Sequence, residues 1–427
     1  MTASPFAPGK PVFAFYGDDF TGSTDALEAL AENGVSAVLF LRTPDAADLR
    51  QFSGCLAVGI AGESRSRPPD WMTSALPPAF GCLRDLGAPL VQYKVCSTFD
   101  SSPQIGSIGC AIEIGRQVFR TRSVGVVPAA PLLGRYVVFG NLFASAPDGI
   151  HRIDRQPAMR DHPATPMTEG DLSIHLGRQT SCRIGGVNLL DLRTRCCPWP
   201  SDAEIVLFDG LDPEDTARAA RSIWEHRAGE QTFAVGSSGL TYGFMNFWRE
   251  RGWLPEPGQF SEAAPRGDGR LLVLAGSCSP VTEVQIRTAL RDGFHGIRLN
   301  PADLNGNAAE IEAVARLSEG RSVILYSALG GDDRVEIDDR PGLASAMGKL
   351  LRNVILISGI RRVVVAGGDT SSHAAQELGI TALTFAAPLA RGAPLCRAHG
   401  WPGGLELVLK GGQIGPRDFF QDVRSRA

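Results

Sequence analysis

The chain has 427 residues, of which 43% are hydrophobic and 21% are charged, the balance of an ordinary globular protein with two or three domains. Lys and Arg number 42 against 46 Asp and Glu, so the net charge of −4 does not favour a nucleic-acid partner, which usually needs a basic surface. No uncharged apolar run approaches the ~20 residues of a membrane-spanning helix, and we expect no signal peptide. The nine cysteines, without a C-x-x-C pair, favour reduced thiols in a cytoplasmic protein and no metal site.

The first half of the chain alternates apolar strands with helical patterns. Residues 12–16 are expected to form a buried strand, 23–33 a helix and 37–41 the next strand, which is a βαβ unit and implies a parallel sheet. The pattern then predicts strands at 55–60, 89–95, 124–127, 204–208 and 233–235, and helices at 105–119 and 213–226. Residues 144–166 are rich in His, Arg, Asp and Pro and are expected to be irregular.

A segment rich in Pro and Gly, Leu254 to Gly269, indicates a linker to a second α/β series. That series predicts strands at 271–275, 297–299, 323–326, 362–366 and 382–385, and helices at 281–290, 308–317, 343–356 and 372–378. The sequence therefore predicts an α/β protein of two domains, 1–258 and 259–427. Each would be built on a mainly parallel sheet flanked by helices, with a cleft between them.

The first loop with reactive side chains is Gly17-Asp18-Asp19-Phe20-Thr21-Gly22, at the expected carboxyl end of a strand, where ligands of open parallel sheets bind. Its adjacent carboxylates can hold a divalent cation, take a proton from a hydroxyl or bond a polyol. A plain helix cap formed by one of the two Asp side chains explains the pair equally well. The dehalogenase-type pattern D-x-D-x-T is not matched, because the two carboxylates are adjacent.

Two further loops suit phosphate, because backbone N–H groups at a helix start attract anions. One is residues 275–280, with Ser277 and Ser279, and the other is residues 364–372, where paired glycines precede Asp, Thr and Ser. Ordinary capping of the following helices is the alternative for both. Neither loop is a Walker A or G-x-G-x-x-G motif. Together with the acidic loop they favour an enzyme that brings a nucleotide to a hydroxylated substrate.

Six short strings in the same order resemble the four-carbon acid sugar kinase family, from about residue 11 to 415. They are 17–22, matching (A/G)DD-x-TG; 134–142, matching G-R-x-V-x-x-G-x-L; 160–169, similar to R-D-P-x-x-P-x-x-E-S; 276–285, matching G-S-x-S-x-x-T-x-x-Q; 367–371, matching G-G-[DE]-T-S; and 410–415, similar to K-x-G-x-x-G. Each string is short, but six in the right order make the resemblance specific.

The resemblance implies an ATP-dependent kinase, working with Mg²⁺, that phosphorylates a hydroxyl of a small acid sugar such as a threonate, erythronate or 3-oxo-tetronate. Domain 1–258 would bind the acid sugar and domain 259–427 the nucleotide. A homo-oligomer is an open possibility, and no membrane partner is expected. Residues expected around the acid sugar are Asp18, Asp19, Lys94, Ser97, Arg135, Arg160 and Asp161. Those expected around ATP are Ser277, Gly367, Gly368, Asp369, Thr370 and Gly411. Asp19 is the first choice, and Asp18 the second, for the carboxylate that deprotonates the attacking hydroxyl.

One segment departs from the family pattern K-x-D-S-T-x-R-G. Lys94, Ser97 and Thr98 are retained, but Cys96 replaces the Asp, and Asp100 and Ser101 replace Arg-Gly. An acidic group and a positive charge would thus be lost from the substrate loop. Because a site that bonds substrate hydroxyls discriminates strongly, the change predicts a different acid sugar, with a branched oxo-isoapionate as a candidate.

Two other functions fit the same loops. The altered segment keeps open a non-catalytic sensor of sugar acids or nucleotides. The Asp pair keeps open a phosphohydrolase that needs no nucleotide. ATP consumption that depends on an added acid sugar separates the kinase from both.

Overall fold

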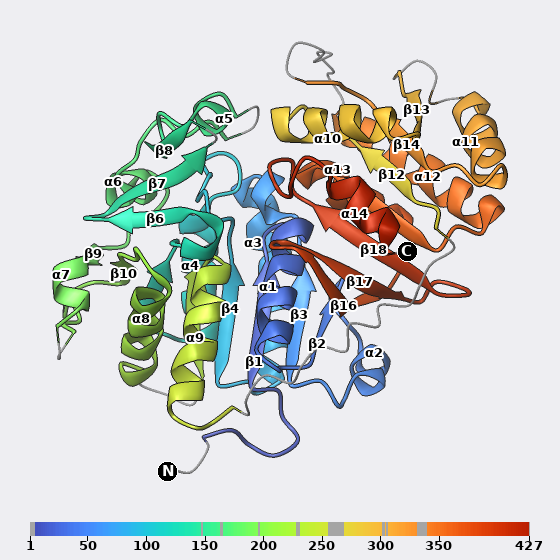
Figure 1. The fold of residues 1–427 in the computed structure, drawn as a ribbon. Coiled ribbons are helices and arrows are strands. Elements are labelled where there is room, and N and C mark those ends of the chain that lie inside the picture. The colour runs from blue at the N-terminus through green and yellow to red at the C-terminus, as the bar shows by residue number, and fades with distance from the viewer. Residues whose placement is uncertain are drawn as a thin grey trace. The chain divides into compact units, whose positions relative to one another are not determined.

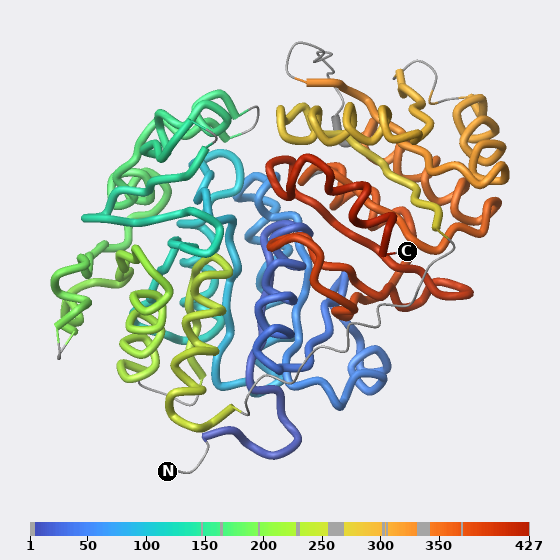
Figure 2. The backbone as a smooth tube through the Cα atoms, viewed as in Figure 1, coloured from blue at the N-terminus to red at the C-terminus, as the bar shows by residue number. Residues whose placement is uncertain are grey.

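The computed structural model describes residues 5–146, 148–162, 165–194, 197–227, 231–254, 269–300, 304, 306–330 and 340–426. The chain divides into two compact units, Met1–Gly258 and Gln259–Ala427, and each is considered by itself (Figure 1). The chain completes the first unit, from blue to yellow-green, before it enters the second (Figure 2). The predicted linker lies, apart from its two ends, outside the described residues, as does Cys196.

The first unit is built on a parallel sheet with the strand order β2-β3-β1-β4-β11-β5-β10-β9. Its strands are β1 (Phe13–Gly17), β2 (Ala37–Phe40), β3 (Ala57–Ala61), β4 (Leu90–Lys94), β5 (Val124–Val127), β9 (Ile184–Val187), β10 (Ile205–Phe208) and β11 (Thr232–Gly236). The register pairs Gly17, the last residue of β1, with both Ala61 of β3 and Lys94 of β4. The loops that follow these three strands therefore begin at the same edge of the sheet.

Helices cover both faces of this sheet because side chains alternate along each buried strand. The longer helices are α1 (Phe20–Glu32), α3 (Pro69–Asp85), α4 (Ile108–Phe119), α8 (Pro213–Glu225) and α9 (Ser238–Glu250). On one face, Tyr16 packs edge-on against Phe80 of α3. On the other, Phe13 packs against Trp248 of α9, and α1, α8 and α9 lie in front of the strands in Figure 1. Because Tyr16 lies near the end of β1, the hydrophobic core of the unit reaches the loop that follows this strand.

A small antiparallel sheet, β6-β7-β8, adds to the first unit. It consists of β6 (Arg135–Val138), β7 (Asn141–Ala146) and β8 (Gly149–Arg152), and the short helices α5 (Pro157–Arg160) and α6 (Leu172–Gly177) follow. The prediction that residues 144–166 are irregular is therefore wrong for 144–146, 149–152 and 157–160, which belong to β7, β8 and α5. β7 and β8 are short and only partly buried, so no hydrophobic period marks them.

The second unit has the strand order β13-β14-β12-β15-β18-β17-β16. The strands are β12 (Leu272–Ala275), β13 (His295–Arg298), β14 (Val323–Tyr326), β15 (Arg362–Ala366), β16 (Ala382–Ala390), β17 (Ala393–His399) and β18 (Leu405–Lys410). The helices are α10 (Pro280–Arg291), α11 (Ala308–Ser318), α12 (Arg340–Ser358), α13 (Gly368–Glu377) and α14 (Phe419–Ser425). The strands from β13 to β18 run parallel, and β17 and β16 continue the sheet antiparallel.

The register of the second sheet also gathers three loops at one edge. Ala366, at the end of β15, pairs with Ala275 of β12 and with Lys410 of β18. The predicted class, a two-domain α/β protein on mainly parallel sheets, is confirmed. Within the described residues, no helix combines the length and the apolar character needed to cross a membrane.

Candidate active site

Asp19 is the N-cap of α1 and has both carboxylate oxygens engaged. Oδ1 accepts a hydrogen bond from the Gly22 backbone N–H at 2.5 Å, and Oδ2 accepts from the Thr21 hydroxyl at 3.0 Å. A Cβ atom on Gly22 would lie 2.6 Å from Asp19 Oδ1 and 2.9 Å from Lys94 Nζ, which explains the glycine at that position. One Asp of the pair therefore does cap the helix, as carboxylates at helix N-termini commonly do.

Asp18 has a different environment. Its side chain is buried, and Oδ1 has no hydrogen-bond partner among the described residues. Burial, reinforced by the neighbouring Asp19 carboxylate, raises the pKa of Asp18 to about 7. The backbone on both sides is held in place, because Asp18 N–H donates to Lys94 O and its own carbonyl accepts from Arg65 N–H. A carboxyl group that titrates near neutral pH in a fixed position is suited to accepting a proton.

Lys94, the last residue of β4, is buried beneath the acidic loop. Its ammonium donates to Val95 O at 3.1 Å and lies 3.6 Å from Asp25 Oδ2 of α1. Burial raises the pKa of Asp25, while Lys94 and Ser238 oppose that rise. The predicted substrate cation is therefore fixed in position by the first helix.

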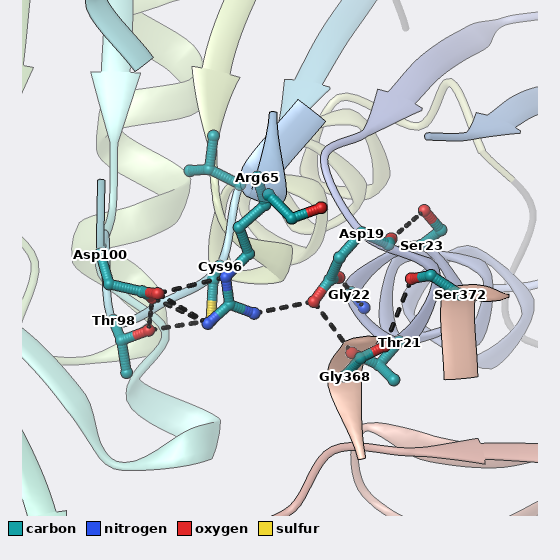
Figure 3. A network of polar contacts seen from close by, with 12 residues as sticks. Asp19, Thr21, Gly22, Ser23, Arg65, Cys96, Thr98, Asp100, Gly368 and Ser372 are labelled. Carbon is teal, nitrogen blue, oxygen red and sulfur yellow. Dashed lines mark hydrogen bonds and ion pairs between the residues drawn. The ribbon is translucent and has the colours of Figure 1, made fainter. Parts of the chain in front are cut away.

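Arg65 joins the acidic loop to the altered segment, and Figure 3 shows its guanidinium between two carboxylates. Nη1 donates to Asp19 Oδ2 at 2.8 Å, while Nε and Nη2 form a bidentate pair with Asp100 at 2.8–3.2 Å. The motif comparison did not single out Arg65. Arg65 lies in the 3-10 helix Ser64–Ser66, a few residues after β3. Because β3 ends at the same sheet edge as β1, the loop after β3 could have been searched for site residues.

Asp100 is buried and keeps its negative charge. Its carboxylate also accepts from Thr98 Oγ1 at 2.5 Å and from Thr165 Oγ1 at 2.8 Å. Burial opposes ionisation, but the Arg65 guanidinium outweighs it and holds the pKa of Asp100 far below its usual value. The acid lost at position 96 is therefore accompanied by a buried, charged carboxylate at position 100.

The other residues of the altered segment, Cys96 and Ser101 among them, are also held in place by contacts. Cys96 Sγ lies 2.9 Å from Thr98 Oγ1, and burial raises the pKa of its thiol. Ser97 is buried in the same loop. Ser101, where the family pattern has glycine, contacts His175 Nε2 of α6 at 2.9 Å and accepts a hydrogen bond from Gln179 at 2.8 Å.

The remaining predicted substrate residues divide into two groups. Arg135 begins β6 and is half-buried, and its Nη1 donates to Leu133 O. Arg160 and Asp161 pair with each other at 2.7 Å, and their side chains are 59% and 65% exposed. Arg160 and Asp161 make no contact with Asp18 or Asp19 in the described part of the chain.

In the second unit, glycines let three loops approach closely. A Cβ on Gly276 would lie 2.0 Å from Thr370 Oγ1, and one on Gly412 would lie 2.4 Å from Ser277 Oγ. Gly367 has φ 127°, a conformation that other residues rarely adopt, and is the N-cap of α13 without any side-chain cap. The first N–H groups of α13 are therefore open to an anion. The backbone of Asp369 belongs to α13, but its side chain lies outside the described atoms.

Lys410 fixes the late glycine loop onto α10. Its buried ammonium donates to Gly411 O at 2.9 Å and to the Thr282 hydroxyl at 3.3 Å, and Thr282 donates to Gly412 O at 2.7 Å. Burial lowers the pKa of Lys410 to about 7. Gln285 adds hydrogen bonds to three successive carbonyls, those of residues 414–416. Gly411 was predicted from the resemblance alone, since its sequence context favours an ordinary turn.

Among the described residues, no group of three or more His, Cys, Asp or Glu side chains is arranged to hold a metal ion.

The two units offer different chemistry. The first unit presents carboxylates beside buried cations at one sheet edge, which suits a charged polyol. The second presents glycine loops and a helix start, which suits phosphate.

Comparisons with known proteins match both units. A family model described as a sugar-binding N-terminal domain matches residues 13–244, and one described as a nucleotide-binding C-terminal domain matches residues 272–420. The chain is 45% identical to a 3-oxo-isoapionate kinase of Paraburkholderia graminis, over 98% of this chain and 95% of that protein. It is 32% identical to a 3-oxo-tetronate kinase of Methylobacterium radiotolerans, over 94% of this chain and 96% of that protein.

Solved structures agree on the fold. A protein of Salmonella typhimurium LT2, 25% identical, superposes with a TM-score of 0.75 over 96% of this chain and 98% of that chain. A Haemophilus influenzae protein from a family of unknown function, 24% identical, has a TM-score of 0.69 over 96% of this chain and 99% of that chain. The family models, the relatives and the ordered motifs confirm the predicted family and enzyme class. The chain belongs to the four-carbon acid sugar kinase family and is a sugar-acid kinase with a nucleotide-binding C-terminal domain.

Proposed function

We propose that this kinase transfers the γ-phosphoryl group of ATP to a hydroxyl of a branched 3-oxo sugar acid of the 3-oxo-isoapionate type. The 45% identity to a 3-oxo-isoapionate kinase supports this branched substrate. The unbranched alternative is 3-oxo-tetronate, the substrate named for the relative that is 32% identical. The departure at Cys96 and Asp100 from the family pattern supports a changed substrate as well. A cytoplasmic location, the absence of a nucleic-acid partner and homo-oligomerisation stay predictions.

The observation that carries the chemistry is the buried Asp18 carboxyl. Its Oδ1 is without a hydrogen-bond partner in the described structure, and its pKa is raised to about 7. Asp19, by contrast, caps α1 and pairs with Arg65, so both of its oxygens already accept hydrogen bonds. We therefore assign acceptance of the hydroxyl proton to Asp18. Asp19 positions Arg65 and the helix start, which reverses the order of preference drawn from the sequence.

The acid sugar would lie at the edge formed by β1, β3 and β4. Lys94 ends β4 and Ser97 follows in the same loop, and each offers a donor to a carboxylate or a hydroxyl. Arg135, at the start of β6, is the third donor that we assign to the acid sugar. Arg160 and Asp161 are left out of this assignment, because they satisfy each other at the surface.

ATP fits the second unit. The glycines at 276, 367 and 412 let the three loops pack closely against one another, so their backbone N–H groups gather at one sheet edge, where a phosphate would bind. Ser277, Gly367, Gly368, Thr370 and Gly411 would hold it, with the Asp369 backbone N–H at the start of α13. Bound ATP supplies the phosphoryl group, and Mg²⁺ would arrive on its phosphates, as Mg²⁺ commonly needs only one or two protein carboxylates.

A coupled ADP-release assay with Mg-ATP tests the proposal against 3-oxo-isoapionate, 3-oxo-tetronate, D-threonate and D-erythronate. We expect kcat/KM to be highest for the branched acid. A clear preference for D-threonate or D-erythronate would contradict the substrate assignment. No turnover with any acid, while ATP binds by calorimetry, would favour the sensor.

A further inference from the structure

Two residues of the altered segment, Asp100 and Ser101, are held by side chains from elsewhere in the first unit. Asp100 Oδ2 accepts a hydrogen bond from Thr165 Oγ1 at 2.8 Å, and both residues are buried. Ser101 Oγ lies 2.9 Å from His175 Nε2 and accepts a hydrogen bond from Gln179 Nε2 at 2.8 Å. Both positions at which the family pattern has Arg-Gly therefore have partners outside the segment.

The turn that precedes these two residues has a strained backbone. Phe99 has φ 55°, in the left-handed region that a residue with a bulky side chain rarely adopts, and its ring is fully buried. Its N–H donates to Cys96 O at 3.0 Å, and its carbonyl accepts from the Ser101 hydroxyl at 3.0 Å. Strained conformations persist only where the surroundings hold them, and they cluster at functional sites. The partners of the next two residues supply that support.

Thr165 belongs to the string 160–169 that is similar to a family motif, and the chain around it is anchored in the core. Met159 and Met167 are buried, and the Met167 N–H donates to the Met159 carbonyl at 2.9 Å. Met167 also belongs to the same hydrophobic cluster as Phe99. The Thr165 hydroxyl is therefore presented by a segment that is packed into the same core as the altered one.

We propose that Thr165 and Ser101 are positioning residues of the acid-sugar site, which hold the altered turn in place and keep Asp100 against Arg65. The proposal rests on the proposed function. The turn closed by the hydrogen bond between residues 96 and 99 contains Ser97, a donor that we assign to the acid sugar. Figure 3 shows the Asp100 carboxylate facing the Arg65 guanidinium. Loss of either hydroxyl would loosen both the Ser97 donor and this ion pair.

Substitutions at Thr165 test the proposal. Thr165→Val removes the hydroxyl and keeps the shape of the side chain, whereas Thr165→Ser keeps the hydroxyl. By ADP release, Thr165→Val should raise the KM for 3-oxo-isoapionate about tenfold, as expected for one hydrogen bond to a charged group. The KM for ATP should not change, and kcat should change little, because binding and not the chemical step is affected.

The controls separate a positioning role from a general loss of structure. Thr168→Val is the matched control, because Thr168 is exposed in the same string. Thr168→Val and Thr165→Ser should both behave as the wild type. An unchanged KM for the acid sugar in Thr165→Val, or equal rises in the KM values for acid sugar and ATP, would overturn the proposal.

A double-mutant cycle tests whether Thr165 acts through Asp100. Because the effects of residues that work through one contact are not additive, Thr165→Val should raise the KM for the acid sugar no further in an Asp100→Ala background. A further tenfold rise in that background would contradict the proposed route. If Thr165→Val does not fold, as judged by thermal unfolding, Ser101→Ala takes its place. A wild-type KM for the acid sugar in Ser101→Ala would then refute the proposal.

Alkylation of Cys96 distinguishes failure of this proposal from failure of the proposed function. Cys96 Sγ lies 2.9 Å from Thr98 Oγ1 within the turn, so a looser turn should expose it. Its reaction with iodoacetamide, followed by peptide mass spectrometry, should be faster in Thr165→Val than in the wild type and Thr165→Ser. A wild type that turns over no acid sugar would refute the proposed function. Equal alkylation rates in all three proteins would instead exclude the role of Thr165 in holding the turn.

Discussion

Replacing Asp18 with Asn should abolish most of the activity while making the protein more stable. Asn has nearly the shape of a protonated Asp, so it fills the same buried place without the ability to take a proton. Loss of a general base typically lowers the rate by about 10²- to 10⁴-fold. ATP binding by the second unit should not change, because Asp18 belongs to the first.

The stability gain follows from the pKa of Asp18. Its value of about 7 in the folded protein, against 3.8 ordinarily, means that the folded state binds more protons than the unfolded state between these two pH values. The free energy of unfolding therefore falls as the pH rises through this window. About three pKa steps at 1.36 kcal/mol each give a cost of at most about 4 kcal/mol above pH 7. Asp18→Asn removes that cost, so its advantage should be small at pH 4 and full at pH 8.

Urea unfolding at pH 4 and pH 8, together with the ADP-release assay, measures both effects. Asp85→Asn is the control, since Asp85 is an exposed residue that pairs with Arg84 at the end of α3. Wild-type kcat should also rise with pH through about 7, because the base must be ionised. An unchanged kcat in Asp18→Asn, or a loss of activity accompanied by lower stability at pH 8, would refute the assignment of the base.

Three further substitutions test the surroundings. Asp100→Asn removes the charge that pairs with Arg65, so the free energy of unfolding in urea should fall by about 3 kcal/mol; a change within about 0.5 kcal/mol would deny the pair its structural role. Gly276→Ala places a Cβ against Thr370 and should weaken ATP binding by calorimetry, whereas Gly54→Ala, which has free space around it, should not; equal affinities would exclude a nucleotide site there. Lys410→Met releases the loop at Gly411 and should raise the KM for ATP about tenfold at an unchanged KM for the acid sugar. A change in the acid-sugar KM instead would contradict that role.

Much of the α/β framework was predictable because parallel strands are short, continuous apolar runs. Strands β5, β14 and β15 lie at the predicted residues, since each is buried from end to end or nearly so. Helix α3 was not predicted. Pro77 and Pro78 lie inside it, and packing of Met72, Leu76 and Phe80 into the core outweighs the helix-breaking tendency of those prolines.

The candidate site was predictable in part, for a geometric reason. Loops after strands can be located in a sequence, so the acidic loop and the two glycine loops were found. Which of two adjacent carboxylates is engaged depends on neighbours that come from other strands. Arg65 pairs with Asp19 across 46 positions of the chain, and no local pattern marks that pair.

The altered segment shows the same limit most clearly. Compared position by position with the family pattern, Cys96 and Asp100 are two separate losses, one of an acid and one of a base. In the folded chain both belong to one network, because Asp100 pairs with Arg65 and accepts from Thr98, whose hydroxyl also contacts Cys96. The carboxylate at position 100, four residues beyond the altered position 96, is the one that keeps Arg65 paired. A sequence comparison counts the substitutions, whereas the contacts show that the altered loop still supplies the carboxylate with which Arg65 pairs.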